Sequence, residues 1–168
     1  MASAAEKAVR RAAVYRRVIG GLRSEGRCRE AMTEAVRWLR AEATHAERLR
    51  PAAAADLYAR LAGQVAGLAE FITEAAVQSA PAARHPQRAA RHRLALAQLQ
   101  EAGQHRQALA GACLWLSSAA AATERADRAG AAAMYSQLAD RVITLAEAVP
   151  GYRAPARTYR APARTGRH

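Results

Sequence analysis

The sequence predicts an all-α protein: a helical bundle of two tandem, internally duplicated three-helix units, followed by a disordered C-terminal tail. The first observation is composition, because Ala, Leu, Arg and Glu are abundant, aromatic residues make up 5% of the chain, and no strand-like alternation occurs. The second is that apolar residues recur at three- and four-residue spacing in six segments. The third is an internal repeat, in which residues 29–70 align with residues 106–147 at an offset of 77 without a gap.

The repeat depends on residue types that rarely match by chance. Of 42 aligned positions, 18 are identical, and eight of these are Ala. The other ten include the only two tryptophans, Trp38 and Trp115, and the tyrosines Tyr58 and Tyr135. We interpret these four aromatic residues as structural anchors, since both copies keep them at the same positions.

The first unit, residues 1–81, is expected to hold three helices. Their approximate ranges are 4–24, 29–48 and 52–78. Gly26 follows the first helix, in a place suited to a left-handed C-terminal cap. Pro51 interrupts the chain near the start of the third helix. The third helix carries apolar residues at heptad spacing from Tyr58, so it should pack nearly parallel or antiparallel to a neighbouring helix.

The second unit, residues 82–150, is expected to pack with the first as one domain, after a linker at Pro81 to Pro86. Its predicted helices cover approximately 87–102, 105–127 and 129–149. The tail, residues 151–168, is different in kind. The heptapeptide Tyr-Arg-Ala-Pro-Ala-Arg-Thr occurs there twice in succession, with no acidic residue and no apolar periodicity. These features predict a disordered basic arm.

The composition limits the class of protein further. The two cysteines, Cys28 and Cys113, do not form a disulfide framework, and we expect a free thiol and a small buried side chain. The longest uncharged run has 16 residues, fewer than the ~18–20 that span a bilayer, so no membrane segment is predicted. The Arg-rich N-terminus resembles a transit peptide, but it has a counterpart inside the chain and is interpreted as structure. A bacterial cytoplasmic protein is expected.

The net charge of +12 is unevenly distributed along the sequence. Residues 1–27, 82–105 and 151–168 together carry +13, and the remainder carries −1. This distribution suggests a binding surface for nucleic acid or another polyanion; the alternative is a solvated basic face in an Arg-rich proteome. The candidate polyanion-binding residues are Arg10, Arg16, Arg17, Arg23, Arg27, Arg88, Arg91, Arg93, Arg153, Arg157, Arg160, Arg164 and Arg167.

The second helices of the two units differ on their outer faces. In the first unit the outward positions are polar: Glu34, Arg37, Arg40, Glu42 and His45. The equivalent positions of the second unit form the candidate partner interface: Gly111, Leu114, Ser117, Ala119 and Ala122. A helix that is apolar almost all round is either packed between the two halves or covered by a partner or a second copy. The sequence leaves both readings open.

Few patterns point to catalysis or to a cofactor. Glu42 and His45 have the Glu-x-x-His spacing of di-iron bundles, but the second unit has only Ala119 and Ala122 there. We therefore predict no metal, no cofactor and no enzymatic activity. Five polar positions recur in both units. They are Arg29/Arg106, Glu47/Glu124, Arg48/Arg125, Tyr58/Tyr135 and Glu70/Glu147. These either fix the turns between helices or form two equivalent ligand sites.

The first two helices of each unit resemble a tetratricopeptide hairpin. In the second unit, Leu94-Ala95-Leu96 leads to Leu99, then to Gly103 in the turn, and then to Ala108 and Ala112. Gly26 and Ala31 have the same spacing in the first unit. The resemblance covers about half of each copy; the repeat offset is 77 residues rather than about 34, and a third helix follows. It implies a helical scaffold that binds protein.

Taken together, these features predict a non-enzymatic interaction or regulatory module that binds a protein partner or self-associates. The alternative is a nucleic-acid-associated protein that binds phosphates through the first helix of each unit and the Arg-rich tail. A third class is a helical-bundle enzyme acting on a small molecule or using a metal.

Overall fold

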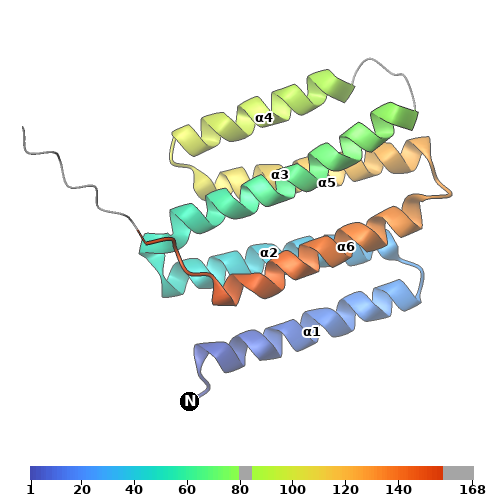
Figure 1. The fold of residues 1–168 in the computed structure, drawn as a ribbon. Coiled ribbons are helices and arrows are strands. Elements are labelled where there is room, and N and C mark those ends of the chain that lie inside the picture. Colours follow the sequence, from blue (N-terminus) through green and yellow to red (C-terminus); the bar gives the residue numbers. More distant parts are fainter. Residues whose placement is uncertain (80–84, 157–168) are drawn as a thin grey trace, which may run out of the picture.

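The computed structural model describes residues 1–79 and 85–156, with side chains described for 1–75 and 87–156. These residues form six α-helices and no strand, which confirms the predicted all-α class (Figure 1). The helices are α1 (Ala4–Ser24), α2 (Cys28–Leu49), α3 (Ala54–Ser79), α4 (His85–Glu101), α5 (His105–Ala126) and α6 (Ala131–Ala148). Two 3-10 turns, η1 (Pro51–Ala53) and η2 (Val149–Gly151), precede α3 and follow α6. Residues 152–156 of the predicted tail form no helix or strand, and residues 157–168 lie outside the described residues.

Two hairpins are closed by glycine in the conformation expected from the sequence. Gly26 between α1 and α2 has φ +74°, and Gly103 between α4 and α5 has φ +73°. In each turn the next amide donates back into the preceding helix, from Arg27 N to Leu22 O and from Gln104 N to Leu99 O, both at 2.9 Å. A residue with a β-carbon would be strained at this φ, and the glycines therefore fix two tight reversals.

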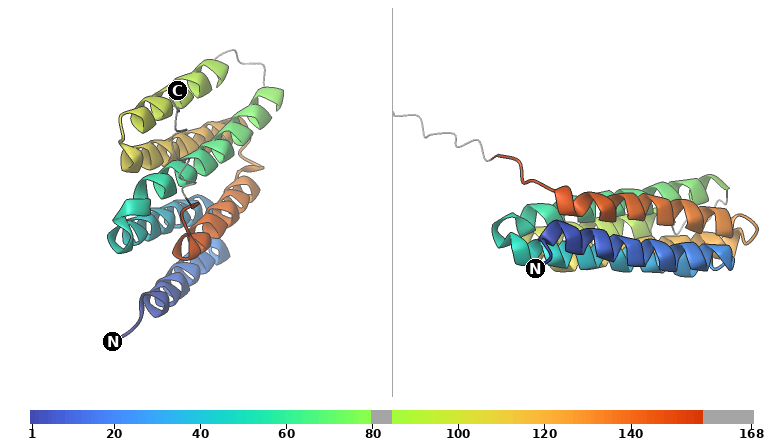
Figure 2. Two further views of the ribbon diagram at one scale, coloured as in Figure 1. Left: turned by 60° about the vertical axis from the view of Figure 1, so that its left-hand side comes forward. Right: turned by 90° about the horizontal axis from the view of Figure 1, so that it is seen from below.

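The helices that follow the hairpins pack on the other half of the chain. α3 lies along α5, and α6 lies along α2, while α1 packs on α2 and α4 on α5. Figures 1 and 2 show each of these long pairs, α3 with α5 and α6 with α2, running in the same direction. The result is a row α1–α2–α5–α4, with α6 and α3 together on one side of α2 and α5 (Figure 1).

The third helix of each half thus packs on the second helix of the other half, an arrangement called here the exchange of third helices. It determines which residues form the core. Leu57, Leu61 and Val65 of α3 are buried, as are Leu138 and Val142 of α6. Fully burying one such side chain contributes roughly 1.5–3 kcal/mol, so each third helix obtains much of its stabilisation from the opposite half.

The four aromatic residues interpreted as anchors are all buried. Trp38 stacks on Tyr15 of α1, with ring centroids 5.6 Å apart and an interplanar angle of 4°. Trp115 stacks in the same way on His92 of α4, at 5.2 Å and 8°. Burial, together with the charge of Arg88, lowers the pKa of His92, which favours the neutral ring. Each indole thus holds an outer helix against the centre.

Glu47 ties three helices together at one end of the bundle. Its carboxylate at the end of α2 accepts a hydrogen bond from Tyr58 Oη of α3 at 2.9 Å, and Arg106 of α5 donates to the same group. The hydrogen bond from Arg106 is the main reason that the pKa of Glu47 is lowered. The equivalent contacts at the other end are Tyr135 Oη to Glu124 at 2.7 Å and Arg29 to Glu124 at 3.5 Å. The Glu47–Tyr58 and Glu124–Tyr135 contacts bridge the turns after α2 and α5. Arg48 and Arg125 form no ion pair with a described carboxylate, and whether the repeated positions also form ligand sites stays a prediction.

One further ion pair recurs at the 77-residue offset. Arg16 of α1 pairs with Glu147 of α6, and Arg93 of α4 pairs with Glu70 of α3. The equivalence therefore extends from single residues to contacts between distant segments. The origin of the chain by duplication of one unit stays a prediction.

The exchange of third helices predicts that neither half is a folded monomer by itself. A fragment of residues 1–81 would expose the apolar faces of α2 and α3 that α6 and α5 cover. We expect this fragment and residues 82–150 to be largely unfolded or self-associated when separate, and to form a helical 1:1 complex when mixed. Circular dichroism and light scattering measure both properties. A monomeric 1–81 fragment with a cooperative melting transition would contradict the expectation.

Candidate functional site

The neighbouring helix α4 covers part of the candidate interface on α5 and leaves the rest exposed. Leu114 is 70% exposed and Ser117 is also exposed, whereas Gly111, Ala119 and Ala122 are half-buried. A β-carbon at Gly111 would lie 3.4 Å from the Leu96 side chain of α4. Gly111 thus lies beneath α4, which explains its small size. Leu114 and Ser117 remain on the open side.

Three neighbouring helices leave only one side of α5 open. α3 packs along one side, α4 along another, and α2 lies beside it in the row. Because α3 and α6 cover the same side of α5 and α2, the open stripes of α5 and α2 face the opposite side together (Figure 1). This open side includes Arg37 and Arg40 of the predicted α2 face and Leu114 and Ser117 of the predicted α5 face. The prediction that Glu42 points outward is wrong, because Glu42 is buried against Arg11 of α1.

A groove of about 460 Å³ runs between α2 and α5 on this surface. Its lining includes three arginines, Arg37, Arg40 and Arg106, and the hydroxyl-bearing residues Thr33 and Thr44. Arg37 pairs with Glu34 and Arg106 pairs with Glu47, but Arg40 pairs with no carboxylate among the described residues. The groove therefore carries positive charge that its own walls do not fully neutralise.

Cys113 lies buried at the junction of α2 and α5. Burial raises the pKa of its thiol to about 11, and the nearby charge of Arg40 opposes that shift. A thiol with so high a pKa is protonated near neutral pH and is a poor nucleophile. Cys113 is therefore a small packing residue, while the other cysteine, Cys28, is a half-buried free thiol.

The candidate polyanion-binding residues divide into three groups. Four of them form ion pairs with carboxylates of the described chain: Arg16, Arg23, Arg27 and Arg93. Five pair with no described carboxylate: Arg10, Arg17, Arg88, Arg91 and Arg153. The remaining four, Arg157, Arg160, Arg164 and Arg167, lie outside the described residues. Arg16, Arg23 and Arg93 each join two helices, whereas Arg27 pairs locally with Glu25 and Glu30 at the turn between α1 and α2. Arg23 donates to both Asp140 at 2.7 Å and the Ser136 carbonyl at 3.0 Å.

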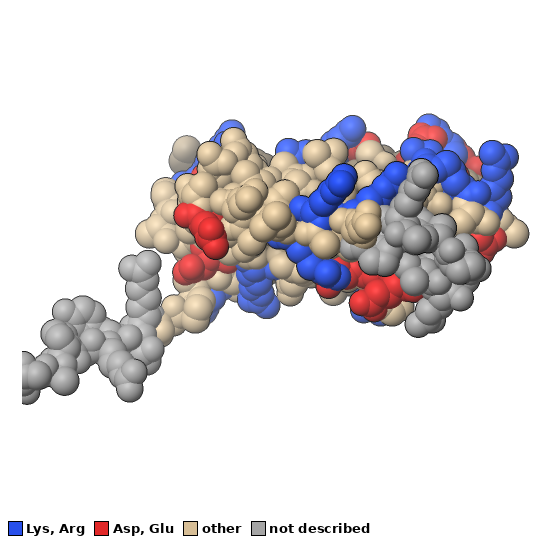
Figure 3. Space-filling model, turned by 90° about the horizontal axis from the view of Figure 1, so that it is seen from above, with Lys and Arg blue, Asp and Glu red and all other residues tan. Residues whose placement is uncertain are grey.

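The two predicted basic helices do not form a single patch. α1 and α4 lie at opposite edges of the bundle, separated by the central helices (Figure 1). Figure 3, which looks down on the α4 edge, shows Lys and Arg side chains gathered over one half of that face and few over the other. A phosphate backbone that contacted both helices would have to cross the bundle.

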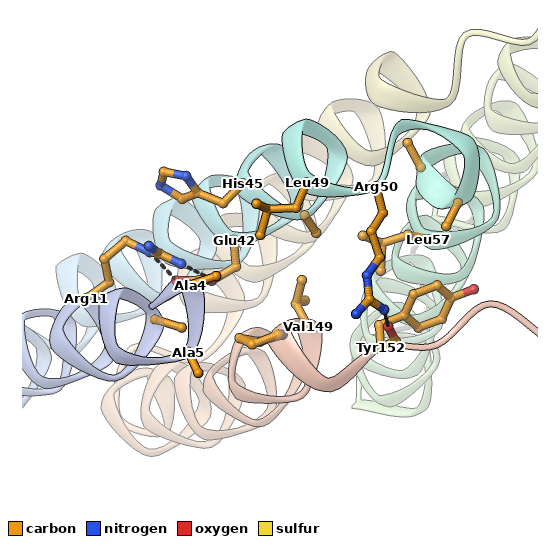
Figure 4. A pocket seen from close by; sticks show the side chains of 15 residues that line it. Ala4, Ala5, Arg11, Glu42, His45, Leu49, Arg50, Leu57, Val149 and Tyr152 are labelled. Carbon is orange, nitrogen blue, oxygen red and sulfur yellow. Dashed lines mark hydrogen bonds and ion pairs between the residues drawn. The ribbon is translucent and has the colours of Figure 1, made fainter. Parts of the chain in front are cut away.

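Glu42 is the only charged residue buried among the described residues, and it is 3% exposed. Arg11 of α1 binds it through two hydrogen bonds, from Nε to Oε1 and from Nη2 to Oε2, both at 2.9 Å (Figure 4). Such a bidentate pair holds α1 in a fixed register on α2. The Glu42–His45 motif is thus tied to an arginine, and the described residues contain no metal-binding cluster of three His, Cys, Asp or Glu. Sequence reasoning missed Arg11, although a glutamate aligned with Ala119 was a visible signal.

The sequence also did not predict an apolar groove beside Phe71. Phe71, the only phenylalanine of the chain, is 72% exposed beside a groove of about 850 Å³ between α3, α5 and α6. Leu68, Ile72 and Met134 also line the groove. We assign no site to it, since nothing in the structure indicates what would occupy it.

No family model matches the chain, and neither a curated protein nor a solved structure matches it. Within the described ranges, no helix combines the length and apolarity that crossing a membrane requires.

Because the Arg11–Glu42 pair is buried, removing Arg11 alone should destabilise the protein more than removing both residues. Arg11→Ala leaves the Glu42 carboxylate buried without a partner and should lower the free energy of unfolding by about 3 kcal/mol. The double variant Arg11→Ala/Glu42→Ala removes the stranded charge as well and should be more stable than Arg11→Ala alone. Urea denaturation measures both values.

Arg16→Ala is the matched control, because it breaks an exposed pair on the same helix and should cost less than about 1 kcal/mol. Equal losses for Arg11→Ala and Arg16→Ala would show that burial of Glu42 has no energetic consequence.

Proposed function

We propose that the protein is a non-enzymatic interaction module that binds an acidic, amphipathic protein segment on the surface formed by α2 and α5. A groove between two helices is a common docking place for a peptide helix, which inserts apolar anchors at regular spacing. The resemblance of each hairpin to a tetratricopeptide hairpin also implies a protein-binding scaffold.

One observation carries the proposal: two unlike stripes lie side by side on one open face. Arg37 and Arg40 of α2 line the groove. Leu114 of α5 lies outside the groove lining and is 70% exposed. A partner segment would complement this face if it carried an apolar side chain flanked by carboxylates. Charge complementarity would speed the encounter, and burial of the anchor would supply most of the affinity.

Charge also favours a foreign partner over a second copy of the chain. Two copies meeting through this face would bring together Arg37, Arg40 and Arg106 from both. Among the described residues, two carboxylates pair with these arginines: Glu34 with Arg37, and Glu47 with Arg106. Neither is free to pair with Arg40 of the other copy. Self-association through this face is therefore electrostatically less favourable than docking of an acidic segment.

A display library of helical peptides tests the proposal on the full chain. Selected peptides should be enriched in acidic residues and in apolar residues at helical spacing. Leu114→Glu and Arg40→Glu should each weaken their binding at least about tenfold, which corresponds to about 1.4 kcal/mol. Fluorescence anisotropy with the selected peptides measures the change.

The matched controls are Leu94→Glu and Arg17→Glu, which place the same substitutions at exposed positions of α4 and α1. Both should leave peptide affinity unchanged. Selection of peptides without acidic residues, or equal losses in test and control variants, would contradict the proposal. A dimer of the wild type that Leu114→Glu dissociates would identify a second copy as the occupant instead.

Nucleic-acid binding is the second candidate, favoured by the net charge of +12 and by arginines without carboxylate partners. Its affinity would come from phosphate contacts and would fall steeply with salt. Arg10 and Arg17 on α1 are the best-placed described residues, because no acidic side chain competes for them. The predicted bacterial cytoplasmic location belongs to both candidates and is part of the proposal.

The nucleic-acid candidate predicts a specific salt dependence. In anisotropy titrations with a labelled duplex, Arg10→Ala/Arg17→Ala should reduce the slope of log K against log salt by about 2, since each phosphate contact contributes about 0.9. Arg16→Ala/Arg93→Ala removes the same charge from residues held by Glu147 and Glu70, and should change the slope less. Absence of binding at low salt would eliminate this candidate.

A further inference from the structure

A separate cavity of about 290 Å³ lies at the other side of α2, beneath the N-terminal turns of α1. The end of α2, the start of α3 and the η2 turn supply the rest of its wall. Figure 4 shows the Arg11–Glu42 pair at one side, Arg50 with Tyr152 at the other, and apolar side chains between them. Leu49, Leu57 and Val149 are among these apolar residues.

The cavity exists because the first turns of α1, before Arg11, present only small side chains there. Ala4, Ala5 and Ala8 line it from α1, and none is long enough to reach the facing helices. The bidentate contact between Arg11 and Glu42 nevertheless holds α1 at a fixed distance from α2. The ion pair therefore keeps the helices apart, and the alanine side chains are too small to fill the space between them.

The charge around the cavity has a definite sign. Glu42 supplies the only carboxylate of the lining, and both of its oxygens accept from Arg11. Arg50 has no carboxylate partner and donates through Nη1 to the Tyr152 carbonyl at 3.2 Å. Its remaining N–H groups bind no other described residue. The uncompensated charge is therefore positive and lies at Arg50, an exposed residue at the edge of the cavity, beside the apolar residues Leu49 and Leu57.

The second half of the chain does not repeat this chemistry. Glu42, His45 and Arg50 align with Ala119, Ala122 and Asp127. Glu42, His45 and Arg50 are thus specific to the first half, whereas Arg11 aligns with Arg88 and is repeated. The requirements of the repeated scaffold do not explain the three specific residues.

We propose that this cavity binds a small carboxylate with an apolar body, with the carboxylate on Arg50 and the body against Leu49, Leu57 and Val149. A volume of 290 Å³ corresponds to about ten water molecules at roughly 30 Å³ each, which limits the ligand to about that number of non-hydrogen atoms. An aliphatic acid of the size of octanoate meets both requirements. Burial of its chain and a charge-assisted hydrogen bond from a guanidinium together provide the affinity. This site is independent of the α2–α5 surface.

Isothermal titration of the full chain with octanoate, octanol and octylamine tests the site. Octanoate should bind most tightly, octanol less tightly because it lacks the charge, and octylamine least. Arg50→Gln should weaken octanoate about tenfold or more and leave octanol within about twofold, because it removes only the charge-assisted contact. Arg50→Gln should therefore lose the preference of the wild type for octanoate over octanol.

A variant that fills the cavity separates binding there from adsorption elsewhere. Ala8→Leu should abolish binding of octanoate and octanol, whereas Ala13→Leu, on the exposed side of the same helix, should not. Far-UV circular dichroism and the urea midpoint confirm that both variants fold. If Ala8→Leu is unfolded, the proposal is tested by the affinities of Arg50→Gln for octanoate and octanol. No binding of octanoate, an unchanged preference in Arg50→Gln, or retained binding in folded Ala8→Leu would each overturn the proposal.

Discussion

The packing of α3 on α5 and of α6 on α2 is the constraint on which the rest of the structure depends. It makes each half of the sequence the cover for the other half, so the buried apolar surface lies mainly between segments distant in the chain. Glu47 and Glu124 secure the exchange at its two ends, because each carboxylate joins the two central helices and the third helix that follows it. The Trp38 and Trp115 stacks then attach the outer helices.

Local features of this fold could be predicted from the sequence because their causes are local. Apolar spacing defined the six helices, and the glycines at Gly26 and Gly103 have the positive φ that a helix cap demands. The exchange of third helices could not be predicted in the same way. Heptad spacing in α3 indicates that a neighbour packs nearly parallel or antiparallel, but an apolar seam does not specify which helix that neighbour is.

The arginines illustrate the same limit for the candidate sites. Charge counted along the sequence places Arg16 and Arg23 in one basic segment with Arg10 and Arg17. In the structure, Glu147 and Asp140 of the distant α6 bind the first two and leave the others unpaired. The stripe on α5 divides similarly, since α4 covers Gly111 and leaves Leu114 open. Only the fold shows which charged or apolar residues are already used for packing.

The repeat gives a criterion for separating scaffold from function. Positions that match at the 77-residue offset, such as Tyr58 and Tyr135, occupy equivalent contacts and are explained by the fold. Both proposed sites instead depend on positions that differ between the halves. Arg40 corresponds to Ser117, and Glu42 corresponds to Ala119. Burying Glu42 requires a dedicated partner, whereas alanine suffices at the same place in the other half. The Arg11–Glu42 pair keeps α1 at a fixed distance from α2, which alanine could not do, and the proposed cavity depends on that distance.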